Sequence, residues 1–254
     1  MNKCLARHLL VTCLALILCI LIFELTALDM QIQQLLYNQG SHQWWWDKQE
    51  FWARLLFYDG IKVVLLVFFL SLLLMFVVSF IKHAIKPLRP GLLIVMLSML
   101  SVPATVGLLK ATTNMACPVN LLQFGGKVEH VPLFSAYPAD KRPAAPQKCF
   151  PAGHASGGFS LLALIFLMPT DRARQWAIVG ALSLGWLMGG YKMLIGDHFL
   201  SHTLVSMLLS WGICCLNAAL VYRFYPAPTN LWKLPESKSI QNDAPPLPAN
   251  SYQA

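Results

Sequence analysis

Charged residues are scarce in this chain. Asp, Glu, Lys and Arg make up 12% of its 254 residues, and hydrophobic residues make up 57%. Soluble domains carry about 25% charged residues. The mean hydropathy is +0.57. This composition excludes an ordinary soluble domain and indicates an integral membrane protein.

Acidic residues are the scarcer charged group, with 11 Asp and Glu against 19 Lys and Arg, and the formal net charge is +8. The basic residues lie mainly between long apolar runs, where they orient membrane spans, so nucleic acid is not an expected partner. No charged residue lies at the centre of a predicted span, Glu24 lying near the end of the first. We also find no inverted repeat, and both absences disfavour a transporter.

Six apolar runs predict the fold, because a bilayer core of about 30 Å needs about 20 apolar residues in a helix. The predicted spans cover residues 9–28, 63–81, 91–109, 155–168, 176–191 and 199–222. Lys and Arg are concentrated in every second connection and beside both ends of the domain. Because segments rich in Lys and Arg stay on the cytoplasmic side, both termini are predicted to be cytoplasmic. We therefore predict an all-α domain of six transmembrane helices over residues 1–225, with outer connections at 29–60 and 111–153. The polar tail, 226–254, is expected to be disordered and cytoplasmic.

The first outer connection, 29–60, is rich in aromatic residues, among them Trp44, Trp45, Trp46 and Trp52. Aromatic rings favour the interface between membrane and water. We predict a helix lying on the outer surface and interpret it as a packing element without chemistry.

Two of the seven cysteines, Cys117 and Cys149, share the second outer connection, whereas the others lie in or beside spans. In an oxidising compartment we expect these two to form a disulfide. Closing a loop of this length is worth about 3 to 4 kcal/mol in the chain-entropy model.

Four titratable residues fall at the outer ends of predicted spans. Lys110 ends the third span, His154 opens the fourth, Lys192 ends the fifth and His198 opens the sixth. Ionisable groups at the membrane edge are costly and mark functional sites by default. Their convergence on one face predicts a site rather than four separate polar contacts.

These residues stand in three motifs, "KATTNMACP", "PAGH" and "YKMLIGDHFLSH". Over residues 91–222 the chain resembles the type 2 phosphatidic acid phosphatase superfamily. That family's signature is Lys, six residues, Arg-Pro; then Pro-Ser-Gly-His; then Ser-Arg, five residues, His, three residues, Asp. The string "KHAIKPLRP", residues 82–90, fits the first block literally, but it lies one membrane crossing away from "PAGH". We interpret it as an inner-face anchor and assign the family lysine to Lys110.

The chain departs from the family pattern at five positions, where Cys117 replaces Arg, Ala152 and Tyr191 replace Ser, Lys192 replaces Arg, and His202 replaces Asp. It looks like a bacterial branch of the superfamily with such variant motifs. The resemblance implies a bacterial inner-membrane protein whose site faces the periplasm.

The resemblance also implies roles for individual residues. His198 attacks phosphorus to form a phosphohistidine, and His154 protonates the leaving oxygen. Lys110 and Lys192 supply cations for the phosphate, and backbone N–H groups around Gly153 supply donors. Neither a metal nor a cofactor is required.

Three further residues complete the prediction. His202, four residues after His198, can face it on a helix and accept its hydrogen bond in place of the family Asp. Lys148 is the favoured replacement for the charge lost at Cys117. Asp197 is interpreted as the N-cap of the sixth helix.

The predicted function is hydrolysis of a phosphate monoester or pyrophosphate of a lipid in the membrane. One alternative is a phosphotransferase, in which a lipid hydroxyl takes the phosphoryl group from His198. Another is a non-catalytic protein that binds anionic lipid at a degenerate site.

A metal site is the remaining alternative. His198 and His202 have the spacing of a helical ligand pair, to which His154, His130 or Glu129 would add a third ligand. Two lysines at the same site would repel a divalent cation, which disfavours this alternative.

Overall fold

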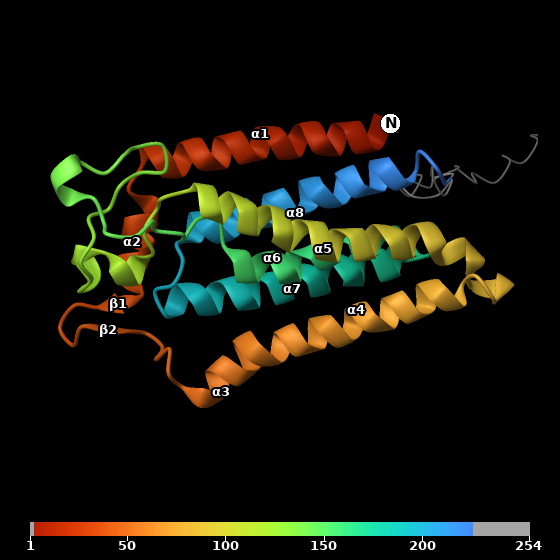
Figure 1. The fold of residues 1–254 in the computed structure, drawn as a ribbon, viewed down its shortest axis with the longest axis horizontal. Coiled ribbons are helices and arrows are strands. Elements are labelled where there is room, and N and C mark those ends of the chain that lie inside the picture. The colour runs from red at the N-terminus through yellow and green to blue at the C-terminus, as the bar shows by residue number, and fades with distance from the viewer. Residues whose placement is uncertain (1–2, 226–254) are drawn as a thin grey trace, which may run out of the picture.

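The computed structural model describes residues 3–225, which are helical apart from loops and one short hairpin (Figure 1). The α-helices are α1 (Lys3–Leu25), α2 (Leu28–Leu35), α3 (Phe51–Arg54), α4 (Gly60–Val78), α5 (Arg89–Thr112), α6 (Gly153–Phe159), α7 (Asp171–Leu194) and α8 (Leu200–Val221). A π-helical turn, η1 (Leu55–Asp59), joins α3 to α4. The 3-10 segments are η2 (His83–Leu88), η3 (Pro118–Asn120), η4 (Leu122–Phe124), η5 (Ala139–Lys141) and η6 (Ser160–Phe166). The hairpin pairs β1 (Tyr37–Asn38) antiparallel with β2 (Gln43–Trp44).

Within residues 3–225, five helical stretches are long and apolar enough to cross a membrane. They are Lys3–Leu25, Phe51–Val78, His83–Thr112, Asp171–Leu194 and Leu200–Val221. Five of the predicted spans fall on these stretches, and the chain is an integral membrane protein. The predicted fourth span, 155–168, falls on the shorter apolar stretch Gly153–Phe166, made of α6 and η6.

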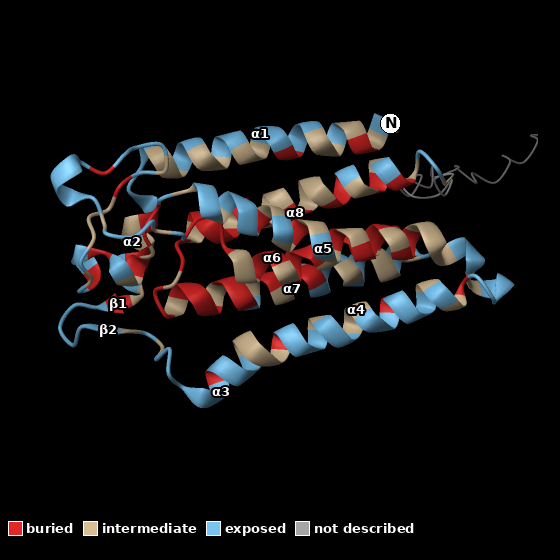
Figure 2. Ribbon diagram, in the orientation of Figure 1, coloured by how far each residue is buried: buried red, intermediate tan, exposed pale blue. Residues whose placement is uncertain are grey.

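The helices differ in how much of their surface the protein covers (Figure 2). Helices α1 and α4 are exposed along most of their length, with large apolar side chains such as Leu14 and Leu66 on the outside. Burial is concentrated in α5, α6, α7 and α8. Apolar side chains that would be unfavourable in water are compatible with lipid tails, so α1 and α4 suit the lipid-facing positions of a bundle.

Glycines bring α6 close to α7. A Cβ on Gly158 would lie 2.7 Å from the backbone nitrogen of Gly185, so neither helix leaves room for a side chain at the crossing. Small residues at such crossings allow membrane helices to approach closely. The close packing places the start of α6 beside the end of α7, at the same end of the bundle where α8 begins (Figure 1).

The outer connection 29–60 differs from its prediction as one surface helix. It folds as α2, the β1–β2 hairpin and then α3, which continues through η1 into α4. The prediction of a helix through Trp44 is wrong, because Trp44 pairs with Tyr37 in the hairpin and its ring contacts the rings of Tyr37 and Phe124. The predicted tail, 226–254, lies outside the described residues.

Candidate active site

The turn between α7 and α8 places the third motif. Lys192, in the last turn of α7, accepts hydrogen bonds at its backbone oxygen from the N–H groups of Asp197 (2.8 Å) and His198 (3.2 Å). Gly196 reverses the chain with a φ of +75°, a conformation that glycine adopts without strain. A Cβ there would also lie 2.4 Å from the ring of Trp44. The β1–β2 hairpin therefore packs directly on the turn that carries His198.

His198 and His202 form a buried pair. Their Nδ1 atoms are 3.3 Å apart, and their exposed fractions are 3% and 0%. Only one hydrogen can lie between two ring nitrogens, so one imidazole donates and the other accepts. The backbone oxygen of His202 accepts from the N–H of Ala152 at 3.1 Å, which ties the "PAGH" motif to the first turn of α8. Burial, reinforced by the charges of His202 and Lys110, lowers the pKa of His198 well below its ordinary value.

A disulfide lies against this pair. Cys117 and Cys149 are bonded to each other, with their Cα atoms 5.2 Å apart, and they join the two ends of the second outer connection. The Cys149 sulfur is 3.5 Å from Nδ1 of His198. The backbone N–H of Cys149 donates to the oxygen of Met115 at 3.2 Å. The disulfide thus holds the segments after α5 and before α6 beside His198.

The possible metal ligands that lie together in the structure differ from the predicted set. In the described part of the chain, the one group of three possible ligands is Cys117, Cys149 and His198, whose donor atoms lie within 4.8 Å of one another. Because the two sulfurs are bonded to each other, they are not thiolate ligands. Glu129, a predicted third ligand, accepts instead from Lys141 at 2.7 Å.

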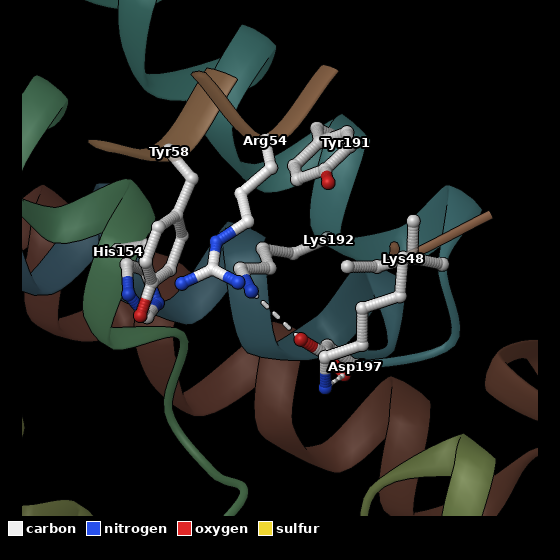
Figure 3. Close-up of a pocket in the computed structure, with 8 residues that line it drawn as sticks. Lys48, Arg54, Tyr58, His154, Tyr191, Lys192 and Asp197 are labelled. Atoms are coloured by element: carbon white, nitrogen blue, oxygen red, sulfur yellow. Dashed lines mark hydrogen bonds and ion pairs between the residues drawn. The ribbon is translucent and has the colours of Figure 1, made fainter. Parts of the chain in front are cut away.

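A cavity of about 330 Å³ opens at this end of the bundle (Figure 3). The residues that line it are Lys48, Arg54, Tyr58, His154, Tyr191, Lys192, Ile195 and Asp197. They come from α3, η1, α6, α7 and the connections before α3 and after α7. Three cations face one carboxylate in this cavity, so it favours an anionic ligand.

Asp197 is the carboxylate of the cavity. It accepts from Lys192 Nζ at 2.7 Å and from Lys48 Nζ at 2.9 Å. Burial alone would raise the pKa of Asp197, but hydrogen bonds from these two lysines hold that pKa below its ordinary value. Asp197 is therefore ionised and neutralises part of the cationic charge.

The prediction that Asp197 caps the sixth helix is wrong. Phe199 occupies the N-cap of α8 and makes no side-chain cap hydrogen bond. The cap comes instead from α2, where Asp29 accepts from the backbone N–H of Ser201 at 3.0 Å and from its hydroxyl group. Asp197 is free for the lysines because Asp29 takes this role.

His154 lines the cavity from the second position of α6. Its ring centroid is 4.5 Å from that of Tyr58. The same tyrosine ring carries Lys192 Nζ 4.4 Å from its centroid. Tyr58 therefore positions a histidine and a lysine next to each other, and aromatic faces attract cations in this geometry.

The remaining predicted residues lie at different distances from the cavity. Lys110 is in the last turn of α5, outside the lining but near enough for its charge to act on His198. Gly153 is the first residue of α6. Lys148 is exposed and does not line the cavity.

Sequence reasoning missed the three lining residues of the first outer connection, Lys48, Arg54 and Tyr58, because it interpreted their segment as packing alone. The available signal was "DKQEFWARLLFYDG", in which cations and aromatic rings alternate within reach of one interface. Such a mixture suits a membrane surface and an anion site equally well.

The fold and the site define a helical membrane protein with a cationic, histidine-containing cavity at one end of its bundle. The sequence profile of the PAP2 superfamily matches residues 91–227, more than half of the chain, and the chain belongs to this family. Membership implies phosphatase-type activity at a membrane. Comparisons with curated proteins and with solved structures gave no significant match.

Proposed function

We propose that the protein is a metal-independent lipid phosphatase of the bacterial inner membrane. It hydrolyses a phosphate monoester or pyrophosphate of a lipid at the periplasmic face, through a phosphohistidine. The observation that carries this proposal is the meeting of His154, Lys192 and Asp197 in one cationic cavity. His198 follows Asp197 in the chain, lies just behind the lining residues and pairs with His202.

The cavity supports binding of a phosphate headgroup. A phosphate monoester carries about two negative charges near pH 7, and such an anion needs fixed cations and N–H donors. Lys192 and Lys110 supply cations from two helices, and the start of α6 at Gly153 supplies backbone N–H groups. Entry from the bilayer suits a site at the end of membrane helices.

His198 is the proposed nucleophile. Its lowered pKa keeps the ring neutral at pH 7, and a neutral nitrogen can attack phosphorus. When Nδ1–H of His198 donates to Nδ1 of His202, the lone pair of Nε2 remains for the attack. The N–P bond forms as the bond from phosphorus to the lipid oxygen breaks.

His154 is the proposed acid and base. It gives a proton to the leaving lipid oxygen. Burial and the charges of nearby lysines lower the pKa of His154 to about 4, and the negative charge of a bound phosphate dianion opposes this shift and favours the protonated imidazole that the step needs. His154 then takes a proton from water as the water oxygen attacks phosphorus and the N–P bond breaks. The products are the dephosphorylated lipid and inorganic phosphate, and His198 returns to its neutral form.

We assign the chain to a variant-motif branch of its family. His202 accepts a hydrogen bond in place of a carboxylate but brings no negative charge, so the imidazolium-like transition state at His198 is less stabilised. The arginine position of the first motif is occupied by Cys117, which is committed to the disulfide. The positive charge that this arginine supplies to the phosphate in other family members must therefore come from another residue.

The test is phosphate release from a panel of lipid phosphates by the purified protein in detergent, with EDTA present. His198→Ala and His154→Ala are compared with the unchanged chain, and His83→Ala, an exposed histidine in η2, is the matched control. We expect release that survives EDTA, persists in the control and is lost in both site variants. Release abolished by EDTA would establish the metal alternative instead.

Transfer to a second lipid is separated from hydrolysis by following a labelled phosphoryl group. A labelled lipid product that forms only when an acceptor lipid is added would identify a phosphotransferase. A folded protein that yields neither free phosphate nor labelled lipid would contradict both enzymatic functions and favour a binding role.

A further inference from the structure

Two of the cations that line the cavity come from outside the part of the chain that matches the family. Lys48 precedes α3 and Arg54 ends it, whereas the family match begins at residue 91. The outer connection before the second predicted span thus contributes directly to the site.

The two cations differ in what they contact. Lys48 is paired with Asp197, which is also paired with Lys192. Arg54 donates through Nε to Asp59 at 3.2 Å, a residue that lies five positions further along the same helical stretch and outside the cavity lining. Figure 3 shows the Arg54 side chain extending from its helix toward His154 and Lys192. Its guanidinium therefore reaches into the cavity.

The pairing of charges in the cavity leaves the guanidinium of Arg54 able to bind an anionic ligand. One carboxylate, Asp197, is shared by two lysines, so Arg54 is the lining cation whose charge Asp197 does not directly pair. A guanidinium presents several N–H groups in a planar fork that matches two oxygens of a phosphate. The solvent-exposed bond from Nε to Asp59 leaves the Nη groups for a ligand.

The first family motif lacks its arginine here, because Cys117 stands at that position and forms the disulfide beside His198. We propose that Arg54 binds the substrate phosphate and supplies, from outside the family domain, the guanidinium that the first motif has lost. This inference rests on the proposed phosphatase function. It assigns the outer connection a binding role rather than a packing role alone.

The experiment measures two quantities for each variant: phosphate release from a lipid phosphate that the unchanged chain hydrolyses, and binding of inorganic phosphate to the His198→Ala chain by calorimetry. Arg54→Ala and Arg54→Lys are compared with Asp59→Asn, which removes the ion pair of Arg54 but keeps the guanidinium. Arg172→Ala, an exposed arginine in the first turn of α7 at the opposite end of the bundle, is the matched control.

We expect Arg54→Ala to weaken phosphate binding and raise KM by about 10- to 100-fold, the range for a charge-assisted contact. Arg54→Lys restores part of that loss because it keeps the charge without the fork. Asp59→Asn and Arg172→Ala stay within about twofold of the unchanged chain, since neither removes a phosphate contact.

The outcomes separate this inference from the function on which it rests. Unchanged phosphate binding and KM in Arg54→Ala, with release intact, would overturn the role of Arg54 alone. An equal loss in Arg54→Ala and Asp59→Asn would also overturn it, because the ion pair would then act structurally. Absence of release by the unchanged chain, together with absence of phosphate binding by the His198→Ala chain, would overturn the proposed function as well.

Discussion

Both ends of α5 carry a basic residue, but the two residues have different surroundings. At its start, Arg89 belongs to "KHAIKPLRP", the literal match to the family's first motif. Arg89 donates to the backbone oxygen of Ser79 at 2.6 Å and to its hydroxyl at 3.0 Å, and its guanidinium lies over the ring of Phe80. At its other end, Lys110 lies near a cavity, a disulfide and a buried pair of histidines.

The two ends differ in the hydrogen-bond and ion-pair partners of their basic residues. Arg89 is bonded to Ser79, the C-cap of α4, so it ties α4 to the start of α5 and has few N–H groups left for a ligand. At the Lys110 end, cations outnumber carboxylates around an open cavity, and the surplus charge suits an anion. A motif is therefore better identified by where its residues meet than by their spacing alone.

The largest expected effect comes from removing one lysine at each end of the bundle, Lys192 at the cavity end and Lys82 at the Arg89 end. We expect Lys192→Ala to lower kcat/KM for phosphate release by about 10²- to 10³-fold, because it deletes a buried cation of the proposed phosphate site. Lys82→Ala, at an exposed position, should stay within about twofold. Both are measured by steady-state release in detergent. A large loss in Lys82→Ala with an intact fold would return the site to the literal motif.

Much of the fold followed from the sequence, because the bilayer imposes a length on apolar runs. Five predicted spans fall on long apolar helices, and Lys110, His154 and Lys192 fall at helix ends as expected, whereas His198 lies in the turn before α8. The fourth span was harder, since its apolar stretch is short and partly 3-10 helical.

The predictions failed where contacts link segments distant in the sequence. No local pattern shows that Asp29 reaches Ser201, 172 residues away, and thereby leaves Asp197 for the lysines. Arg54 was missed for the same reason, because its segment shows interfacial chemistry and only the tertiary fold places it over the cavity. Helix positions were predictable from composition, whereas the pairing of charges was not.

The disulfide sharpens the comparison because it cross-links only the site end, within residues 3–225. Replacing Cys117 and Cys149 by Ser should lower the free energy of unfolding by about 3 to 4 kcal/mol, since the bond closes a loop of 32 residues. Thermal unfolding in detergent measures the loss. Hydrogen exchange should increase around His198 and remain unchanged around Arg89. Uniform loosening of both ends would contradict a local role.

Asp29 gives the site end a pH dependence. Burial raises the pKa of Asp29 from 3.8 to about 6, although hydrogen bonds from Ser201 oppose the shift. The folded chain therefore binds more protons than the unfolded chain between these pH values, so the free energy of unfolding falls as pH rises through this window and levels off above it. Asp29→Asn should remove this dependence, worth up to about 3 kcal/mol.

Unfolding of Asp29→Asn is followed in detergent from pH 4 to pH 8. Asp59→Asn, an exposed acid, serves as the control and should keep the slope of the unchanged chain. The same slope in Asp29→Asn and the unchanged chain would show that another group titrates.

The smallest expected effect concerns His202, the position at which the chain departs from its family beside the proposed nucleophile, His198. A carboxylate there would stabilise positive charge on His198, whose Nδ1 lies 3.3 Å from that of His202. We expect His202→Asp to raise kcat by about tenfold and to shift the pH profile of His198 upward. His202→Ala should lower kcat, because it leaves Nδ1 of a buried ring without its partner. If His202→Asp lowers kcat as much as His202→Ala does, the imidazole serves the reaction in a way that a carboxylate cannot, and this position is a specialisation of the branch rather than a weakened copy of the family site.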